Sequence, residues 1–256
     1  MNKEELIKLV KRKKEFSGLP NELISNFLEF YLKKINFEKI SKHDAKIIIK
    51  EIRAQLRYSV GQYQTGSKNR EKLLEENKIT ELLKTHSSTA ERMDFYPTLK
   101  KLIKKLNVKS VLDLGCGLNP IALASNEIKY HASDIREDEL FLVRKFFKKN
   151  KIVGKVFVCD LKNLQKKLPK ADLCLILKVF DIIDDKNHET PEKIVQEVPC
   201  EKMLVSFPSK KLSGKQMNHP RRFWFEKILY KLNYNFETFH SDNEIFYLIC
   251  QDLFFS

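Results

Sequence analysis

The sequence predicts an α/β fold: an all-helical N-terminal domain followed by a Rossmann-like, mainly parallel sheet of seven strands. Three observations predict it. The first 106 or so of the 256 residues contain no convincing strand. From Lys109 onward, short apolar runs alternate with helical patterns, which is the rhythm of β-α-β units. Two strand-like segments near the C-terminal end are joined by a short turn, which indicates an antiparallel pair at a sheet edge.

The N-terminal region reads as successive amphipathic helices. Glu4–Lys14 begins with acids and ends in a basic run, which complements the helix dipole. Apolar residues recur at helical spacing in residues 21–32 and again after Ser41, which is a good N-cap. A break at Gly61–Ser67 precedes another helix over Asn69–Leu83. We place the boundary between the two predicted domains at residues 106 and 107, so that residues 1–106 are helical and residues 107–256 contain the sheet.

The elements of the sheet domain follow from short apolar runs and the helical patterns between them. A helix is predicted wherever apolar residues change from runs to a period of 3.6. The predicted strands are Ser110–Leu114, Lys129–Asp134, Lys155–Asp160, Ala171–Leu177, Lys202–Phe207, Asn235–Phe239 and Glu244–Ile249. The predicted helices are Glu137–Lys149, Leu164–Leu168, Pro191–Val198 and Phe223–Leu232.

Composition excludes some classes of protein and favours others. No run of about 18 apolar residues exists and the N-terminus lacks an apolar signal segment, so we expect no membrane association. The five cysteines include no C-x-x-C pair, which favours free thiols in a reducing cytoplasm over disulfides or zinc. The net charge of +14 and the pI near 9.4 favour a polyanionic partner. Charge alone leaves RNA, DNA, an anionic surface and a simple compositional bias open.

The segment Val111–Pro120 carries the strongest local signal. A buried strand breaks into Gly115-Cys-Gly117 and then opens a helix, and glycines let the backbone approach a ligand closely. Dinucleotide sites prefer a third glycine, but here Pro120 follows. Asp113 gives the D-x-G-x-G form that is typical of S-adenosylmethionine (SAM) sites. We therefore predict SAM as the cofactor.

Acidic residues follow at successive strand ends, where the cofactor crevice of such a sheet lies. Asp134 stands 17 residues after Gly117 and could accept hydrogen bonds from the two ribose hydroxyls. Asp160 and Leu161 could hold the adenine ring, and Leu177 with Lys178 ends the strand beside the sulfonium position. Each could instead be a helix cap or a solvated strand end. Their shared position at strand ends favours the cofactor interpretation.

A polar block, His86-Ser-Ser-Thr-Ala-Glu-Arg-Met93, precedes the sheet. Its hydroxyls could simply cap the next helix. Arg92 could clamp the carboxylate of a cofactor through paired hydrogen bonds. A structural role remains open for His86.

These blocks together resemble the aminoglycoside-resistance 16S rRNA (guanine-N7) methyltransferases of the Arm/Rmt/Sgm-like, FmrO type. The resemblance covers about residues 70–250. Its blocks are His86-Ser-Ser-Thr-x-Glu-Arg92, Leu112–Pro120, Tyr130-His-Ala-x-Asp134, Leu175-x-Leu-Lys178, Val205-Ser-Phe-Pro208, Leu212-Ser-Gly-Lys215 and Trp224-Phe-Glu226. The His-x-Ser-Thr block and the Ser-Phe-Pro block followed by Leu-Ser-Gly are not general features of methyltransferases, so the resemblance is specific.

The resemblance implies methylation of guanine N7 in the decoding site of 16S rRNA, with the 30S subunit as substrate. It implies a cofactor pocket that includes His86, Ser87, Ser88, Arg92, Gly115, Gly117, Asp134, Asp160, Leu161 and Leu177. Residues 206–215 would face the target base, which would be flipped out of its stack, with Phe207, Ser213 and Lys215 positioning it. Phe207 and Trp224 could equally be core residues. The helical domain would dock on rRNA, and we expect a cytoplasmic monomer with no DNA partner and no metal.

Other functions remain open from the sequence. Between Gly214 and Trp224 the chain has a shorter loop than the family pattern, which leaves the exact target base and a role in host rRNA maturation open. A SAM methyltransferase for another rRNA position or for a non-RNA substrate is one alternative. A non-catalytic ribosome-binding factor on the same scaffold is another. The missing third glycine disfavours a nicotinamide enzyme.

Overall fold

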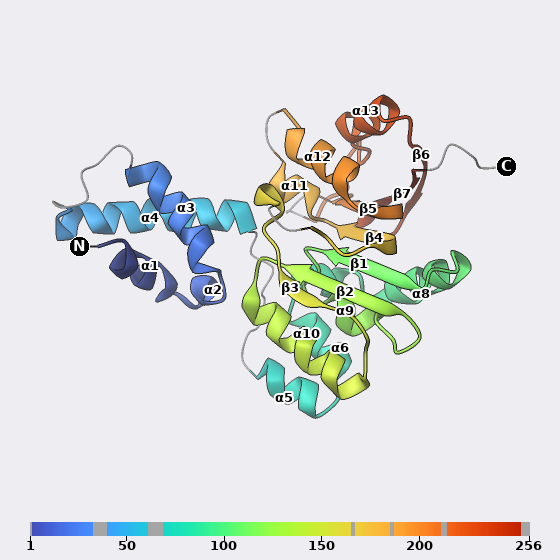
Figure 1. Ribbon diagram of the computed structural model, residues 1–256, viewed down its shortest axis with the longest axis horizontal. Coiled ribbons are helices and arrows are strands. Elements are labelled where there is room, and N and C mark those ends of the chain that lie inside the picture. Colours follow the sequence, from blue (N-terminus) through green and yellow to red (C-terminus); the bar gives the residue numbers. More distant parts are fainter. Residues whose placement is uncertain are drawn as a thin grey trace.

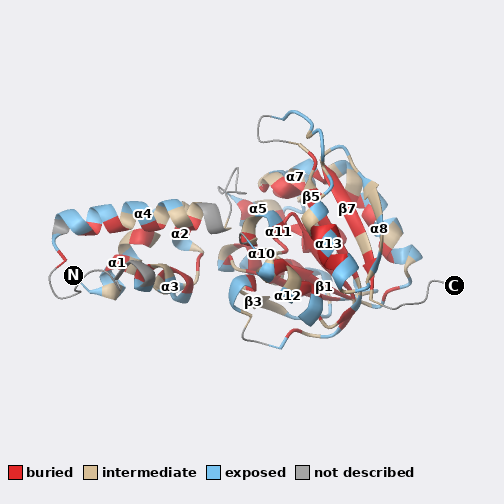
Figure 2. Ribbon diagram, turned by 90° about the horizontal axis from the view of Figure 1, so that it is seen from above, coloured by how far each residue is buried: buried red, intermediate tan, exposed pale blue. Residues whose placement is uncertain are grey.

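The computed structural model describes residues 2–32, 40–60, 69–164, 167–184, 187–210 and 214–251. Within these residues, a small helical bundle lies beside a larger layered part that contains the sheet (Figure 1). Figure 2 shows that the inner faces of the helices and the central strands are buried. None of the described helices is both long and apolar enough to cross a membrane.

The first four helices, α1 to α4, form what we call the N-terminal bundle. Their inward residues make a hydrophobic cluster that includes Leu6, Ile24 and Ile52. The helix predicted over Glu4–Lys14 is interrupted, because Lys13 adopts an extended backbone with ψ of 129° and begins a second short helix. That break buries Phe16 in the cluster. The bounds are α1 (Lys3–Lys11), α2 (Lys14–Ser17), α3 (Asn21–Leu32) and α4 (Lys42–Val60).

The next helices pack on the sheet rather than on the bundle. Leu82 and Leu99 belong to the same hydrophobic cluster as Val111 and Tyr130 of the sheet. The helix predicted over Asn69–Leu83 is interrupted at Asn77, which has a left-handed φ of 58°. The helices are α5 (Arg70–Glu75), α6 (Ile79–Lys84), α7 (Ser87–Glu91), η2 (Met93–Phe95) and α8 (Tyr96–Lys105). This packing favours a domain boundary between α4 and α5, and we propose it there in place of residue 106.

The seven strands of the described chain have the order β3-β2-β1-β4-β5-β7-β6. Strands β1 to β5 pair in parallel, whereas β7 is antiparallel to both β5 and β6, as the terminal strand pair predicted. The strands are β1 (Ser110–Leu114), β2 (Lys129–Asp134), β3 (Val156–Val158), β4 (Ala171–Leu177), β5 (Cys200–Pro208), β6 (Asn235–His240) and β7 (Glu244–Cys250). The predicted α/β fold with seven strands is confirmed.

Helices cover both faces of the sheet (Figure 1). One face packs against α8, α9 (Asn119–Leu123) and α10 (Glu137–Asn150), and the other against α11 (Phe180–Ile183), α12 (Glu189–Glu197) and α13 (Phe223–Lys231). Alternate strand residues therefore enter two different clusters, as for Val111 and Leu112.

The helix predicted over Leu164–Leu168 is wrong for the part that is described. The short helix η3 (Leu161–Asn163) stands just before it, and residues 164, 167 and 168 are not helical. The carboxylate of Asp160 accepts a hydrogen bond from the backbone N–H of Lys162 at 3.0 Å, which begins that turn early.

Candidate cofactor-binding site

A cavity of about 540 Å³ lies at the carboxyl ends of the parallel strands. Its walls include the ends of β1, β2 and β4, and β1 and β4 are the neighbours between which the strand order reverses. This switch point is where open α/β sheets bind their ligands. The volume falls within the range of about 300–1,000 Å³ that small-molecule sites occupy.

The glycine turn forms the floor of the cavity. Gly115 and Gly117 both line it and both have left-handed φ angles, of 67° and 48°. A Cβ on Gly115 would lie 2.6 Å from Cγ2 of Val179, and one on Gly117 would lie 2.9 Å from Nε2 of His86. Both positions therefore require glycine for conformation and for space.

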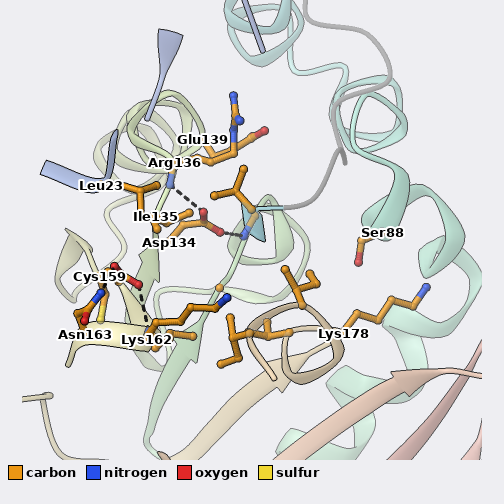
Figure 3. Close-up of a pocket in the computed structure, with 18 of the residues that line it drawn as sticks. Leu23, Ser88, Asp134, Ile135, Arg136, Glu139, Cys159, Lys162, Asn163 and Lys178 are labelled. Carbon is orange, nitrogen blue, oxygen red and sulfur yellow. Dashed lines mark hydrogen bonds between the residues drawn. The ribbon is translucent and has the colours of Figure 1, made fainter. Parts of the chain in front are cut away.

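Asp134 ends β2 beside this turn, as predicted. Its Oδ2 accepts a hydrogen bond from the N–H of Gly117 at 2.8 Å, and its Oδ1 accepts one from the N–H of Arg136 at 2.9 Å (Figure 3). Burial raises the pKa of Asp134 to about 6, although these two N–H donors favour the carboxylate. Each oxygen keeps a further lone pair for a ligand.

The neighbouring strand end supplies Asp160 and Leu161, which also line the cavity. Asp160 caps η3 through Lys162 and also accepts a hydrogen bond from Nδ2 of Asn163 at 2.9 Å. The capping interpretation that the sequence left open is therefore realised. Because Asp160 remains in the cavity wall, capping also fixes its position there.

On the other side of the cavity lie His86, Ser88, Leu177 and Lys178. Burial lowers the pKa of His86 to about 4, so its ring is neutral at pH 7. The Nζ of Lys178 pairs with Glu91 and lies 3.6 Å from Oε1 of Glu244. Ser87, which the resemblance included in the pocket, is not among the residues that line this cavity.

Arg92 lies behind Ser88 and does not line the cavity. Its Nε and Nη2 donate to the two carboxylate oxygens of Glu244, each at 2.9 Å, and its Nη1 donates to Oδ1 of Asn119 at 2.7 Å. Its Nη2 is also 3.4 Å from Oγ of Ser88. The side chain of Ser88 thus stands between the guanidinium and the cavity, and the guanidinium is paired with Glu244 inside the protein. Its predicted contact with a cofactor carboxylate stays a prediction.

The residues expected to position a target base are placed less favourably. Phe207 is fully buried among Trp224, Phe225 and Tyr247, so the core interpretation holds in this conformation. Ser213 lies outside the described residues. Lys215 is exposed on the loop after β5. Neither Phe207 nor Lys215 lines the cavity, and the role of all three residues toward a base stays a prediction.

Sequence reasoning missed the part of the cavity wall that the N-terminal bundle supplies. It also missed cavity residues that are chain neighbours of the predicted ones. Ile135 and Cys159, for example, could have been inferred from their positions next to Asp134 and Asp160. No sequence signal distinguishes the bundle residues from an ordinary apolar helix face. The missed residues are Leu23, Asn26, Phe27, Gln55 and Val60 from the bundle, and Ile135, Arg136, Glu139, Cys159, Lys162, Asn163, Val179, Ile182 and Ile183 from the sheet part.

Comparison with known proteins identifies this arrangement. Residues 50–248 match the family model described as ribosomal RNA methyltransferase (FmrO). The chain belongs to the FmrO family. The glycine turn and the strand ends that form the cavity lie inside the matched segment, so the resemblance drawn from the sequence is confirmed.

Curated relatives are similar to this chain in sequence, and a solved structure is similar to it in fold. A protein of Frankia casuarinae named 16S rRNA (guanine(1405)-N(7))-methyltransferase is 25% identical over 67% of this chain and 63% of its own length. One of the same name from Serratia marcescens is 28% identical over 76% of this chain and 80% of its own. The structure of the 16S rRNA methyltransferase RmtF in complex with S-adenosyl-L-homocysteine (SAH) has a TM-score of 0.80 at 20% identity, covering 98% of this chain and 100% of that one.

Proposed function

We propose that this protein is a SAM-dependent methyltransferase that modifies guanine N7 in the decoding site of 16S rRNA within the 30S subunit. The observation that carries the proposal is the cavity at the switch point, with Asp134 and the glycine turn, in a chain of the FmrO family. The names of the two curated relatives support the chemistry, and the SAH in the RmtF structure supports the cofactor.

The cavity suits an adenosine-bearing cofactor. Asp134 presents two carboxylate oxygens of the kind that hold ribose hydroxyls, and Leu161 offers an apolar surface for the adenine ring. Gly115 and Gly117 give room for close approach of the ligand to the backbone. Ser88 and Lys178 would stand near the amino-acid end. When bound, SAM supplies an electrophilic methyl group on a sulfonium.

The chemistry requires little from the protein beyond positioning. Guanine N7 has an exposed lone pair and needs no deprotonation before it attacks a methyl group. His86 is buried and neutral at pH 7, and its ring lies beside Gly117. Rate would come from in-line placement of N7 and methyl and from the fixed charges of the site.

A basic groove on the N-terminal bundle would dock on rRNA. It has a volume of about 370 Å³ and lies between α1, the turn that follows it, and α4; its lining residues are Leu9, Arg12, Lys13, Lys46, Ile49, Lys50, Arg53 and Arg57. Arg53 and Arg57 are engaged within the bundle, by the carbonyls of Leu9 and Val10 and by Glu15. Lys46 and Lys50 are exposed one turn apart on α4 and face outward for phosphates.

The direct test is transfer of a tritiated methyl group from SAM to purified 30S subunits, followed by mapping with borohydride and aniline. We expect cleavage at one N7-methylguanine in the decoding site. The Asp134→Ala variant serves as a matched control with a disabled cofactor site. Label on another base would replace the target, and no label on RNA despite cofactor binding would contradict the proposed substrate.

The same modification is proposed to give aminoglycoside resistance. A methyl and a positive charge on N7 would hinder a drug that binds in the decoding site. Expression in a susceptible bacterium should then raise the inhibitory drug concentration for the wild-type chain but not for Asp134→Ala. Modification without a change in susceptibility would favour a role in rRNA maturation.

A ribosomal substrate also supports a cytoplasmic location, and we propose action as a monomer.

A further inference from the structure

One wall of the cofactor cavity comes from the N-terminal bundle. Leu23, Asn26 and Phe27 of α3 line the cavity, and Gln55 and Val60 of α4 do so as well. The three residues of α3 are spaced so that they share one helix face. Figure 3 shows Leu23 beside Ile135 and Asp134, at the ribose end of the site. The bundle therefore forms part of the cavity wall.

The bundle is joined to the sheet through the segment that follows Asp134, which we call the latch (Ile135–Glu137). Ile135 packs against the hydrophobic cluster of the bundle. Nη1 of Arg136 donates to the carbonyl of Glu15 at 3.0 Å, and the N–H of Glu137 donates to the carbonyl of Gly18 at 2.9 Å. The N–H of Arg136 holds Oδ1 of Asp134. One short segment thus positions both the ribose-binding carboxylate and the bundle.

The bundle also reaches the opposite side of the cavity. Helix α4 packs against α11, which begins directly after Lys178 and Val179. Both of those residues line the cavity. The bundle therefore spans the site from the end of β2 to the end of β4, and any ligand that fills the site contacts both parts of the protein.

We propose that α3 and α4 complete the cofactor site, so that cofactor binding is coupled to the position of the bundle that docks on rRNA. The inference rests on the proposed function for its second half. A ligand that contacts both parts holds them in one arrangement, and linkage makes the effect reciprocal: a bundle held in place by the 30S subunit would bind the cofactor more tightly.

Hydrogen exchange of the wild-type chain, with and without SAH, tests the composite site directly. We expect SAH to slow amide exchange in α3 and α4 as well as in residues 115–118 and 134–137. Protection confined to the sheet part would overturn the proposal. A wild-type chain that binds no SAH would instead contradict the proposed function.

Side-chain truncation of the bundle wall provides a second test. Phe27→Ala and Gln55→Ala should each weaken SAH binding by about fivefold or more in isothermal titration calorimetry. Ile7→Ala is the matched control, because Ile7 packs on the same bundle cluster without lining the cavity. Equal affinities in all three variants would overturn the proposal. If Phe27→Ala does not fold, Asn26→Ala replaces it, since Asn26 is exposed and lines the cavity.

The coupling itself is tested with Gly18→Ala. Gly18 accepts the hydrogen bond from Glu137 of the latch and lies outside the cavity. A Cβ there would lie 2.1 Å from Oδ1 of Asp138 and should displace the loop from the start of α10. We expect SAH to strengthen 30S binding of the wild type by about fivefold or more, within the usual range of coupling. We expect that factor to approach one in Gly18→Ala. A wild type that binds SAH and methylates 30S, but whose 30S affinity ignores SAH, would contradict the coupling alone.

Discussion

Asp134 shows how a single carboxylate can serve both the fold and a ligand. Its two oxygens hold the N–H groups of Gly117 and Arg136, which fixes the glycine turn against the end of β2. The same oxygens border the cavity. The strand-end rule predicted its place, as it did for Asp160, Leu161 and Leu177, because a residue at the end of a parallel strand must reach the crevice.

Replacing Asp134 by Ala should weaken SAM or SAH binding by about 1.5–3 kcal/mol, because charge-assisted hydrogen bonds are lost. Calorimetry on the purified chain measures it, and 30S binding in the absence of cofactor should stay within twofold of the wild type. Asp172→Ala is the matched control, since Asp172 on β4 also accepts hydrogen bonds from two backbone N–H groups but does not line the cavity. Unchanged affinity in Asp134→Ala would remove the ribose assignment.

Cofactor affinity should fall as the pH drops below about 6. The pKa of Asp134 is raised to about 6 by burial, so the carboxylate that accepts ribose hydroxyls predominates above that pH and is lost below it. The loss should approach about tenfold per pH unit. SAH titrations from pH 8 to pH 5 provide the measurement.

The pH profile has internal controls. Asp134→Asn should flatten it, whereas a titration carried by Asp113, whose pKa burial raises to about 7, would survive that change. His86, with its pKa lowered to about 4, does not titrate in this window. A profile that survives Asp134→Asn would assign the titration to another group.

At the scale of elements, the strands were predictable and the helix breaks were not. The bounds predicted for β1, β2 and β4 agree with the structure, because a run of apolar residues flanked by turns is a local signal. The breaks at Lys13 and Asn77 depend on where apolar residues can be buried, which periodicity does not report. The same holds for Arg92, whose partner Glu244 stands 152 residues away.

Glu244→Gln should lower the free energy of unfolding by about 3–5 kcal/mol, because it leaves Arg92 buried without an anionic partner. Both side chains are fully buried, and the pair joins Glu244 of β7 to Arg92, the residue that caps the end of α7. Urea unfolding at pH 7 measures the loss. Glu201→Gln, at an exposed acid on β5, is the control and should be neutral. Equal stability of the two variants would show that the pair contributes little.

Gly117→Ala should weaken SAH binding by about tenfold or more, because a Cβ would collide with the His86 ring and φ is left-handed. The same substitution is made in a His86→Ala background, which removes the collision. Because His86 also lines the cavity, calorimetry compares the double variant Gly117→Ala/His86→Ala with His86→Ala alone, and the loss of affinity should be smaller than in the wild type. If Gly117→Ala costs the same affinity in both backgrounds, backbone conformation rather than space is the reason for glycine here.

At the scale of the whole molecule, the question is where the excess positive charge lies on the surface. The basic groove lies on the bundle, whereas α8 lies on the far side of the sheet part (Figure 1). The sequence predicted excess positive charge but not its location, because net charge is a sum over the chain. Where the charge gathers follows from the packing of α1 against α4.

Lys46→Ala/Lys50→Ala should weaken 30S binding and lower the slope of log affinity against log salt by about one per lysine. Filter binding at several salt concentrations measures both. Lys101→Ala/Lys105→Ala is the matched control, since these two exposed lysines stand one turn apart on α8. Equal slopes in the two double variants would move the docking surface away from the groove.

The sequence by itself determined the α/β class, the seven strands, the glycine turn and the strand-end acids, because periodicity and strand-end positions are local properties of the chain. Only the tertiary structure decided which partner Arg92 takes, that Phe207 is in the core, and that α3 and α4 close the cofactor cavity. These depend on contacts between segments far apart in sequence. An amphipathic helix face looks the same in sequence whether it meets other helices or a ligand.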